Sequence, residues 1–281
     1  MKHLLRGLAP ITERAWERLD QEARQALEAT LAARRVVDFR GPEGWDLPSV
    51  DLGRVEALDD APVDGARARL RRVLPLVEIR VPFDLPRTEL EALARGAHEA
   101  DLDVLREAAL RAALAEDTSV LGGFPAAGIR GILPEAGSRA TELPEDFARF
   151  PDALAAAFEQ LRSAGVQGPY ALLLGPDAYE ALLRSTHRGG YPVVEHVRRE
   201  LDGPVLLANA LTGGDRAGVL VSTRGGDFEL TVGQDFAIGY TSHTAETVTL
   251  YIEETFTFLP IGPEVAVPFT SSRVSARAKR G

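Results

Sequence analysis

The stretch VLVSTRGGDFELTVGQDFAIGYTSHTAETVTLYIEETFTF, residues 219–258, decides the fold because it holds the clearest strand pattern in the chain. Residues 228–232 and 247–258 each alternate apolar with polar side chains. A period of two gives a strand one apolar and one polar face. The polar residues 241–246 between the two runs are typical of a turn. We therefore expect long antiparallel strands with one face against a hydrophobic core.

One acidic residue, Glu254, falls on the apolar phase of the second run. We favour a β-bulge at this position, because one extra residue would shift the phase. The alternative is a buried carboxylate that pairs with a cation. The neighbouring Glu253 would point to the opposite face of the strand. No residue type or spacing in residues 219–258 indicates reaction chemistry.

Composition limits the class of protein. The chain has 281 residues, 45% of them hydrophobic, which is enough for one large or two medium domains with a core. It has no cysteine, which excludes disulfides and thiolate metal sites, and its formal net charge of −10 argues against nucleic acid as a partner. No apolar run reaches the length of a membrane span, and residues 1–16 lack the apolar region of a signal peptide. We therefore expect a cytoplasmic protein with no membrane partner.

Residues 45–83 indicate an extended hairpin. The segments Trp45 to Leu58 and Ala66 to Phe83 have the pattern of strands, and residues 59–65 between them are rich in turn formers. The first part of this hairpin is too polar to cover a core by itself. Such an arm is either mobile or buried against another chain. Pairing is the more economical account, because bare edge strands promote association.

Two long helices are predicted. The first begins after Thr12, a suitable N-cap, and ends near Arg34 and Arg35. Its apolar stripe, which either packs on its own domain or stays partly open for a partner, consists of Ala15, Trp16, Leu19, Ala23, Ala26, Leu27, Thr30 and Leu31. The second helix spans Asp101 to Thr118 and is rich in strong helix formers. Its expected buried positions are Leu102, Leu105, Ala109, Ala112 and Ala113.

The rest of the chain indicates a second, smaller unit and a tail. From Ala136 onward, helical segments alternate with short apolar segments such as residues 170–174 and 205–208, as in an α/β unit. Residues 264–281 end in a polar, basic sequence. We expect this tail to be disordered and solvated, with contact to nucleic acid as the alternative.

Motifs of catalysis and metal binding are missing from the sequence. None of the five histidines has the helical i, i+4 spacing of a metal site, and the glycine-rich segments lack the lysine and hydroxyl residues of a phosphate loop. No nucleophile elbow of the G-x-S-x-G type occurs. We therefore expect a protein that is not an enzyme and that needs no cofactor. Two features favour an assembly protein: the extended arm, and the first helix, whose apolar stripe is a candidate surface for a partner.

Segments spread from Leu8 to Pro263 resemble the encapsulin shell proteins, a family also described as linocin-like or bacteriocin-type. The resemblance rests on LAPITERAWERLDQEAR (8–24), RRVVDFRGPEGW (34–45), LPLVEIRVPF (74–83), GIRGIL (128–133), GPYALLLGPDAY (168–179), GGYP (189–192), RGGDFELTVGQDFAIGY (224–240) and LYIEETFTF (250–258). The last two segments together are a specific signature, whereas GGYP alone is weak.

This resemblance implies an α+β fold, the major capsid fold of tailed phages (the Hong Kong 97 type). Copies of such a chain close into an icosahedral shell, so the chain itself is its first expected partner. The implied segments are an N-terminal helix and the start of the peripheral (P) domain at 1–44, an extended (E) loop at 45–77, the P domain with its spine helix at 78–135, an axial (A) domain at 136–224, P-domain strands at 225–263 and the basic tail at 264–281.

The family encloses cargo enzymes, such as dye-decolourising peroxidases or ferritin-like proteins, through short terminal targeting peptides. The resemblance places the peptide groove at Leu27, Leu31, Arg34, Asp38, Leu230, Asp235, Phe236 and Ile238. Apolar side chains would take the anchors of the peptide, while Arg34 and Asp38 would fix its backbone or its charges. The alternative is that Arg34 and Asp38 merely pair with each other.

The resemblance also implies a pore loop at the five-fold axis, formed by Thr186, His187, Arg188, Gly189, Gly190, Tyr191 and Pro192. Five converging copies of His187 and Arg188 would set the charge that small solutes meet. A plain surface loop is the alternative. Some members carry a tryptophan that stacks a flavin, but Thr88 occupies that place here. We therefore expect no flavin.

Two other functions fit the sequence less well. A phage or prophage major capsid protein would enclose DNA, and both the acidic balance and the N-terminal helix argue against it. A hydrolase or a bacteriocin lacks support, because no nucleophile–base set is present.

Overall fold

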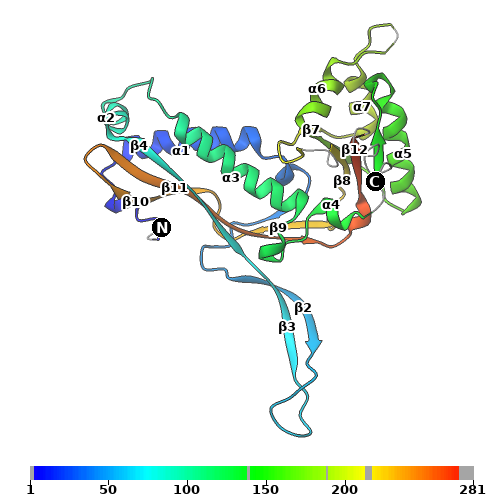
Figure 1. Cartoon of the computed structure of the whole chain (residues 1–281), viewed down its shortest axis with the longest axis horizontal. Helices are drawn as coiled ribbons and strands as arrows, with labels where there is room; N and C mark the ends of the chain where they lie inside the picture. The colour runs from blue at the N-terminus through cyan, green and yellow to red at the C-terminus, as the bar shows by residue number, and fades with distance from the viewer. Residues whose placement is uncertain (1–2, 138–139, 188, 213–216, 272–281) are drawn as a thin grey trace, which may run out of the picture.

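The chain forms two lobes and a projecting arm (Figure 1). The structure is a computed structural model that describes residues 3–137, 140–187, 189–212 and 217–271. We call the larger lobe, built on a sheet with two long helices and a short one, the spine lobe. The second lobe, which holds β5 to β8, β12 and helices α5 to α7, is the α/β lobe. The arm is the two-stranded hairpin of β2 and β3.

The sheet of the spine lobe is organised around one long strand. Its strands are β1 (Asp38–Arg40), β4 (Val77–Pro86), β9 (Phe228–Val232), β10 (Ala237–His243) and β11 (Thr247–Pro260). β11 is antiparallel to β4, β9 and β10, and β1 runs parallel to β9. Val232 lies opposite Phe256 and Leu230 opposite Phe258, so the expected antiparallel pairing of residues 228–232 with 247–258 is confirmed. The predicted turn at 241–246 is too long, because residues 241–243 belong to β10, the strand that turns directly into β11.

The pairing of β11 corrects the expectation for Glu254. The register between β11 and β4 is continuous, and Glu254 lies opposite Ile79 without an inserted residue. The irregular position of this sheet lies instead on β10, between Tyr240 and Ser242. The predicted β-bulge at Glu254 is therefore wrong. Glu254 is the alternative, a buried carboxylate that pairs with a cation.

Three helices pack on this sheet: α1 (Glu13–Thr30), α2 (Arg87–Arg95) and α3 (Asp103–Gly122). The stripe of α1 is buried within the chain, at Ala15, Trp16, Leu19, Ala23, Leu27 and Thr30. Most of the stripe therefore packs on its own domain, whereas Ala26 and Leu31 at its end are half-buried and stay partly open. The expected positions on α3, from Leu102 to Ala113, are also buried, which confirms its inner face.

The first helix ends earlier than its sequence pattern indicates. Thr12 caps its start, as predicted, by accepting a hydrogen bond from the Ala15 backbone at 3.3 Å. The helix stops at Thr30, and Leu31 is already extended. The carboxylate of Asp117 takes the backbone N–H groups of Ala32 and Ala33 at 2.9–3.3 Å. These N–H groups are therefore not available to continue the helix, and the prediction that it runs to Arg34 and Arg35 is wrong.

The α/β lobe has a five-stranded sheet in the order β5-β12-β8-β6-β7. The strands are β5 (Thr141–Leu143), β6 (Tyr170–Leu174), β7 (Val205–Leu207), β8 (Gly218–Ser222) and β12 (Ala266–Ser271), and the helices are α5 (Phe150–Ser163), α6 (Pro176–Arg184) and α7 (Val193–Leu201). The short elements of the chain are η1 (Arg6–Leu8), η2 (Ala33–Arg35), η3 (Pro125–Ala127), α4 (Ile132–Glu135), η4 (Phe147–Arg149) and η5 (Pro263–Val265).

The position of β12 corrects the prediction of a disordered tail at residues 264–281. β12 lies between β5 and β8, and its first four residues are buried. Phe269 packs against Phe150 of α5 with ring centroids 5.7 Å apart. Residues 265–269 are therefore part of a core, because their apolar run VAVPF supplies a strand inside the sheet. Residues 272–281 lie outside the described part of the chain.

The arm extends away from both lobes (Figure 1). β2 (Ser49–Ala57) and β3 (Arg69–Pro75) are antiparallel, and they form a sheet of their own. The register shifts between Asp51 and Arg54. Most side chains of both strands are exposed. The predicted hairpin and its lack of a core are therefore confirmed for β2 and β3. The prediction that its second strand runs on to Phe83 is wrong, because Val77–Pro86 is a separate strand, β4, that pairs with β11 in the spine lobe.

Candidate functional site

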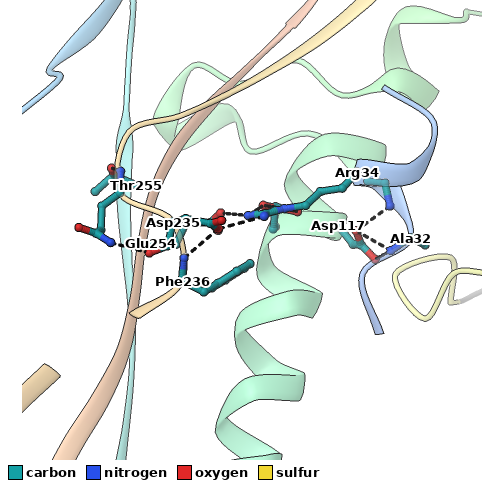
Figure 2. A network of polar contacts seen from close by, with 10 residues as sticks. Ala32, Arg34, Asp117, Asp235, Phe236, Glu254 and Thr255 are labelled. Atoms are coloured by element: carbon teal, nitrogen blue, oxygen red, sulfur yellow. Dashed lines mark hydrogen bonds and ion pairs between the residues drawn. The ribbon is translucent and has the colours of Figure 1, made fainter. Parts of the chain in front are cut away.

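Arg34 is the centre of a buried polar network that joins three parts of the spine lobe (Figure 2). Its Nε donates to both carboxylate oxygens of Glu116 on α3, at 2.9 and 2.8 Å. Its Nη1 donates to Asp235, just before β10, at 2.9 Å. Its Nη2 donates to Glu254 of β11 and lies 2.6 Å from Glu116. One guanidinium thus connects η2 with the spine helix, the long strand and the segment before β10.

Two aromatic rings flank the same guanidinium. The Cζ atom of Arg34 lies 4.9 Å from the ring centre of Phe39 and 4.8 Å from that of Phe236. Cation–π contacts of this kind are worth about 0.5–2 kcal/mol each. Phe39 is 40% exposed and Phe236 is half-buried, so both rings keep area that faces solvent. This exposed area makes the network a candidate for binding a ligand.

Burial and neighbouring charges shift the pKa values of Glu254 and Arg34 in the network. The side chains of Glu116 and Glu254 are 0% and 1% exposed. Burial, and then the charge of Glu116, raise the pKa of Glu254 well above its ordinary value. Burial alone would lower the pKa of Arg34, but the hydrogen bond and charge of Glu116 outweigh burial, so its pKa rises and the guanidinium stays charged.

Asp117, next to Glu116 on α3, has a separate role. It is 1% exposed, and it accepts the backbone N–H groups of Ala32 and Ala33 that end helix α1. Burial raises the pKa of Asp117 to about 6, although these two N–H groups oppose the shift. Asp117 therefore fixes the backbone that carries Arg34 into the network.

The structure divides the eight groove residues proposed from the resemblance. Leu27, Leu230 and Ile238 are buried in the cores of this chain, at 7%, 0% and 2% exposure. These three side chains pack in the core under the site and are not accessible to a ligand. The other five, Leu31, Arg34, Asp38, Asp235 and Phe236, are half-buried or exposed. They come from the segment after α1 and the segment before β10, which Arg34 and Asp235 join.

The expected alternative for Arg34 and Asp38, an ion pair between them, is not what the structure shows. The carboxylate partners of Arg34 are Glu116, Asp235 and Glu254. Asp38 instead accepts the backbone N–H of Gly226 at 2.6 Å. It also lines a hollow of about 130 Å³ together with Val37, Thr223 and Phe228. Asp38 therefore belongs to a neighbouring surface and leaves Arg34 to the other three carboxylates.

Two residues of the network escaped the sequence analysis, Glu116 and Phe39, and the paired state of Glu254 was only its less favoured alternative. Glu116 lies three and four positions after the buried Ala113 and Ala112, so it continues the inner face of α3. Glu254 falls on the apolar phase of β11. Two acidic residues on apolar faces were therefore a readable signal that a buried cation had to lie nearby.

The proposed pore loop lies at the tip of the α/β lobe (Figure 1). A bridge between Thr186 and Pro192 closes its base, and the His187 N–H donates to the Tyr191 carbonyl at 2.9 Å. Gly189 and Gly190 have positive φ angles of 107° and 82°. Arg188 lies outside the described residues. That this loop lines a pore remains a prediction. The expected absence of a flavin at Thr88 on α2 also remains a prediction.

Comparison with known proteins assigns the family. The family model described as "Encapsulating protein for peroxidase" matches residues 1–257. The chain belongs to the encapsulin shell proteins. A type 1 encapsulin shell protein of Rhodospirillum rubrum is 52% identical over 273 residues, which cover 95% of this chain and 96% of the relative. Like other encapsulin shell proteins it is a structural component of a shell, as expected from the sequence.

Solved structures confirm the predicted fold class. The virus-like particle protein of Pyrococcus furiosus matches with a TM-score of 0.62 at 18% identity, covering 90% of this chain and 98% of that one. A protein of Mycobacterium phage Bobi matches with a TM-score of 0.58 at 13% identity, covering 86% and 91%. This encapsulin therefore has the α+β capsid fold of tailed phages. Within the described residues, no helix is both long and apolar enough to cross a membrane.

Proposed function

We propose that copies of this chain close into an icosahedral shell in the cytoplasm and enclose a cargo protein by binding its terminal targeting peptide. The cargo is an enzyme of the peroxidase or ferritin-like class, and the shell subunit itself has no enzyme activity. Membranes and nucleic acid have no part in this function.

The exposed arm supports the assembly of many copies. Five apolar side chains of the arm and its tip, Val55, Leu58, Val63, Leu70 and Val73, are between 46% and 66% exposed. A single chain leaves both edges of this hairpin open, and open edges favour pairing with another chain. Covering the arm with neighbouring copies would bury these side chains.

The observation that carries the cargo proposal is the fixed position of Arg34 beside two partly exposed rings. A short peptide binds best where apolar anchors find aromatic surface next to a preorganised polar group. Phe39, Phe236 and Leu31 offer the apolar surface, and Asp235 and Arg34 offer the polar groups. Three carboxylates already hold Arg34, so little side-chain entropy is lost when the peptide binds.

The test is to purify the protein from its source cells as wild type and as Leu31→Asp. We expect wild-type particles in the megadalton range, closed shells in electron microscopy, and a second protein inside them by mass spectrometry. Leu31→Asp places a charge on the apolar surface and should reduce the enclosed protein at least about tenfold while shells still form. Leu31→Met, which keeps the apolar surface, is the matched control and should retain cargo.

Two outcomes would contradict the proposal separately. A monomer or small oligomer at neutral pH and physiological salt contradicts the shell. Full loading of Leu31→Asp shells contradicts the assignment of the cargo site but leaves the shell in place.

A further inference from the structure

The Arg34 network holds more negative than positive charge, and this imbalance has a consequence. Glu116, Asp235 and Glu254 all contact Arg34, so the four side chains carry a net charge of −2 when every carboxyl is ionised. Asp235 is 41% exposed, and water can solvate its charge. Glu116 and Glu254 are almost fully buried, and two buried carboxylates on one cation cost more than that cation can offset.

The geometry brings the two buried carboxyl groups together. Both contact the same atom, Nη2 of Arg34, Glu116 at 2.6 Å and Glu254 closer still. Burial, and then the charge of Glu116, raise the pKa of Glu254 well above its ordinary value, which agrees with a proton on Glu254. Paired carboxyl groups in a shared site bind one proton between them, because both cannot ionise at short range.

We propose that Glu254, which meets Glu116 at Nη2 of Arg34, holds a proton at neutral pH, and that this proton keeps the wall of the cargo site at Asp235 and Phe236 in place. When a base in the solvent removes the proton, the two carboxylates repel each other and compete for Nη2 of Arg34. The guanidinium then leaves Asp235. Glu116 and Glu254 are positioning residues: they act through Arg34 and do not touch the cargo.

The link from Arg34 to Phe236 is short. Oδ1 of Asp235 accepts one hydrogen bond from Arg34 Nη1 and one from the Phe236 backbone N–H, both at 2.9 Å. The ring of Phe236 also lies against the guanidinium. Loss of the Arg34 contact therefore frees both the backbone and the ring of Phe236. The other charged groups at the network are Asp117 on α3, which holds the η2 backbone, and Asp38 on β1, which binds Gly226.

The direction of the pH effect follows because Glu254 binds its proton more tightly in the folded state than in the unfolded state. The folded state holds this proton on Glu254 where the unfolded state has lost it, so the stabilisation is complete at low pH and disappears as the pH rises through the raised pKa of Glu254 in the folded state. The inference rests on the proposed function and adds a pH regulation of the same site. The peptide site should loosen in alkaline solution and stay ordered at neutral pH.

The experiment compares wild type with Glu254→Gln in cargo-free shells, because glutamine has the shape of a protonated glutamate. Infrared difference spectra at pH 7 should show the C=O band of a protonated carboxyl in wild type that Glu254→Gln lacks. Hydrogen exchange of residues 234–237 should rise about tenfold more between pH 7 and pH 10 than base catalysis alone predicts in wild type, and should follow base catalysis in Glu254→Gln. Glu91→Gln, at a glutamate on α2 that is 59% exposed, is the control and should behave as wild type.

Two results would overturn the inference. One is the absence of the carboxyl band in the wild-type spectrum. The other is a Glu254→Gln protein whose segment 234–237 is already loose at pH 7, since that would show that the site needs a second negative charge. If Glu254→Gln does not assemble, Glu116→Gln gives the same readouts. Because no cargo is present, these measurements stand even if the Leu31→Asp test contradicts the cargo site.

Discussion

The spine lobe and the arm differ in how completely a single chain pairs its own polar side chains and buries its own apolar ones. In the spine lobe, Arg34 has three carboxylate partners, and the stripe of α1 is buried beneath it. In the arm, β2 and β3 have no other strand partner among the residues that the structure describes, and apolar side chains such as Val55 and Leu70 are more than half exposed. The stability of the lobes is therefore a property of the single chain. The arm buries little of its own apolar surface, so we expect its order to depend on assembly.

The largest expected effect is the loss of a whole lobe. Ending the chain after Gly262 removes β12 from between β5 and β8, together with the buried Phe269. We expect the α/β lobe to unfold, and near-ultraviolet circular dichroism and limited proteolysis should show it. A chain that ends after Ser271 is the control. Equal spectra for the two truncated chains would mean that β12 is dispensable and that the lobes are less self-sufficient than we infer.

A large effect is also expected at the centre of the spine lobe. Arg34→Ala leaves Glu116 and Glu254 buried without their cation, which should lower the free energy of unfolding by about 3–5 kcal/mol. Urea denaturation of the dissociated subunit measures this change. Arg71→Ala removes an exposed ion pair to Asp51 on the arm and should cost at most about 1 kcal/mol. Similar losses for both variants would contradict the contrast between lobe and arm.

Asp117 should give the spine lobe a pH dependence of intermediate size. Burial raises its pKa to about 6, so the folded state favours its protonated form. Wild type should therefore lose stability as the pH rises from about 4 to about 6, by about 3 kcal/mol for a shift of this size. Asp117→Asn cannot titrate, and its unfolding free energy should vary less over this range. Parallel pH profiles for the two proteins would remove Asp117 as the cause.

The smallest effect on subunit stability is expected in the arm. Val55→Asp changes a side chain that is 53% exposed, so the unfolding free energy of the dissociated subunit should change by less than about 0.5 kcal/mol. Assembly, followed by light scattering, should nevertheless fail, because the charge would enter an interface between copies. Normal assembly of this variant would show that Val55 stays in water in the shell.

Local patterns account for the parts of the fold that the sequence predicted well. The alternation in residues 247–258 and the composition of Asp101 to Thr118 depend on neighbours along the chain, and β11 and α3 follow them. The arm was predictable for the same reason. Family resemblance then supplied the arrangement of these elements, which periodicity alone does not contain.

Long-range polar contacts account for what could not be predicted. Arg34 meets Glu116 across 82 positions of sequence and Glu254 across 220. Helix α1 stops early because Asp117 takes the N–H of Ala32, 85 positions away. A pattern in sequence can show that Glu254 lies on an apolar face, but only the fold shows which cation it meets there. The sequence therefore predicted the segments of the candidate site, after α1 and before β10. It did not predict the Arg34 network that holds these segments together.

The position of β12 sets an order of events during synthesis. This strand is the last described element of the chain, yet it pairs with β8 and β5 inside the sheet of the α/β lobe. A ribosome makes the spine helix, the arm and most of the α/β lobe well before residues 266–271 emerge, and domains generally fold as they appear. We expect that the α/β lobe cannot close until residues 266–271 have emerged. A nascent chain with its arm already exposed would thereby be kept from completing a subunit until β12 is available.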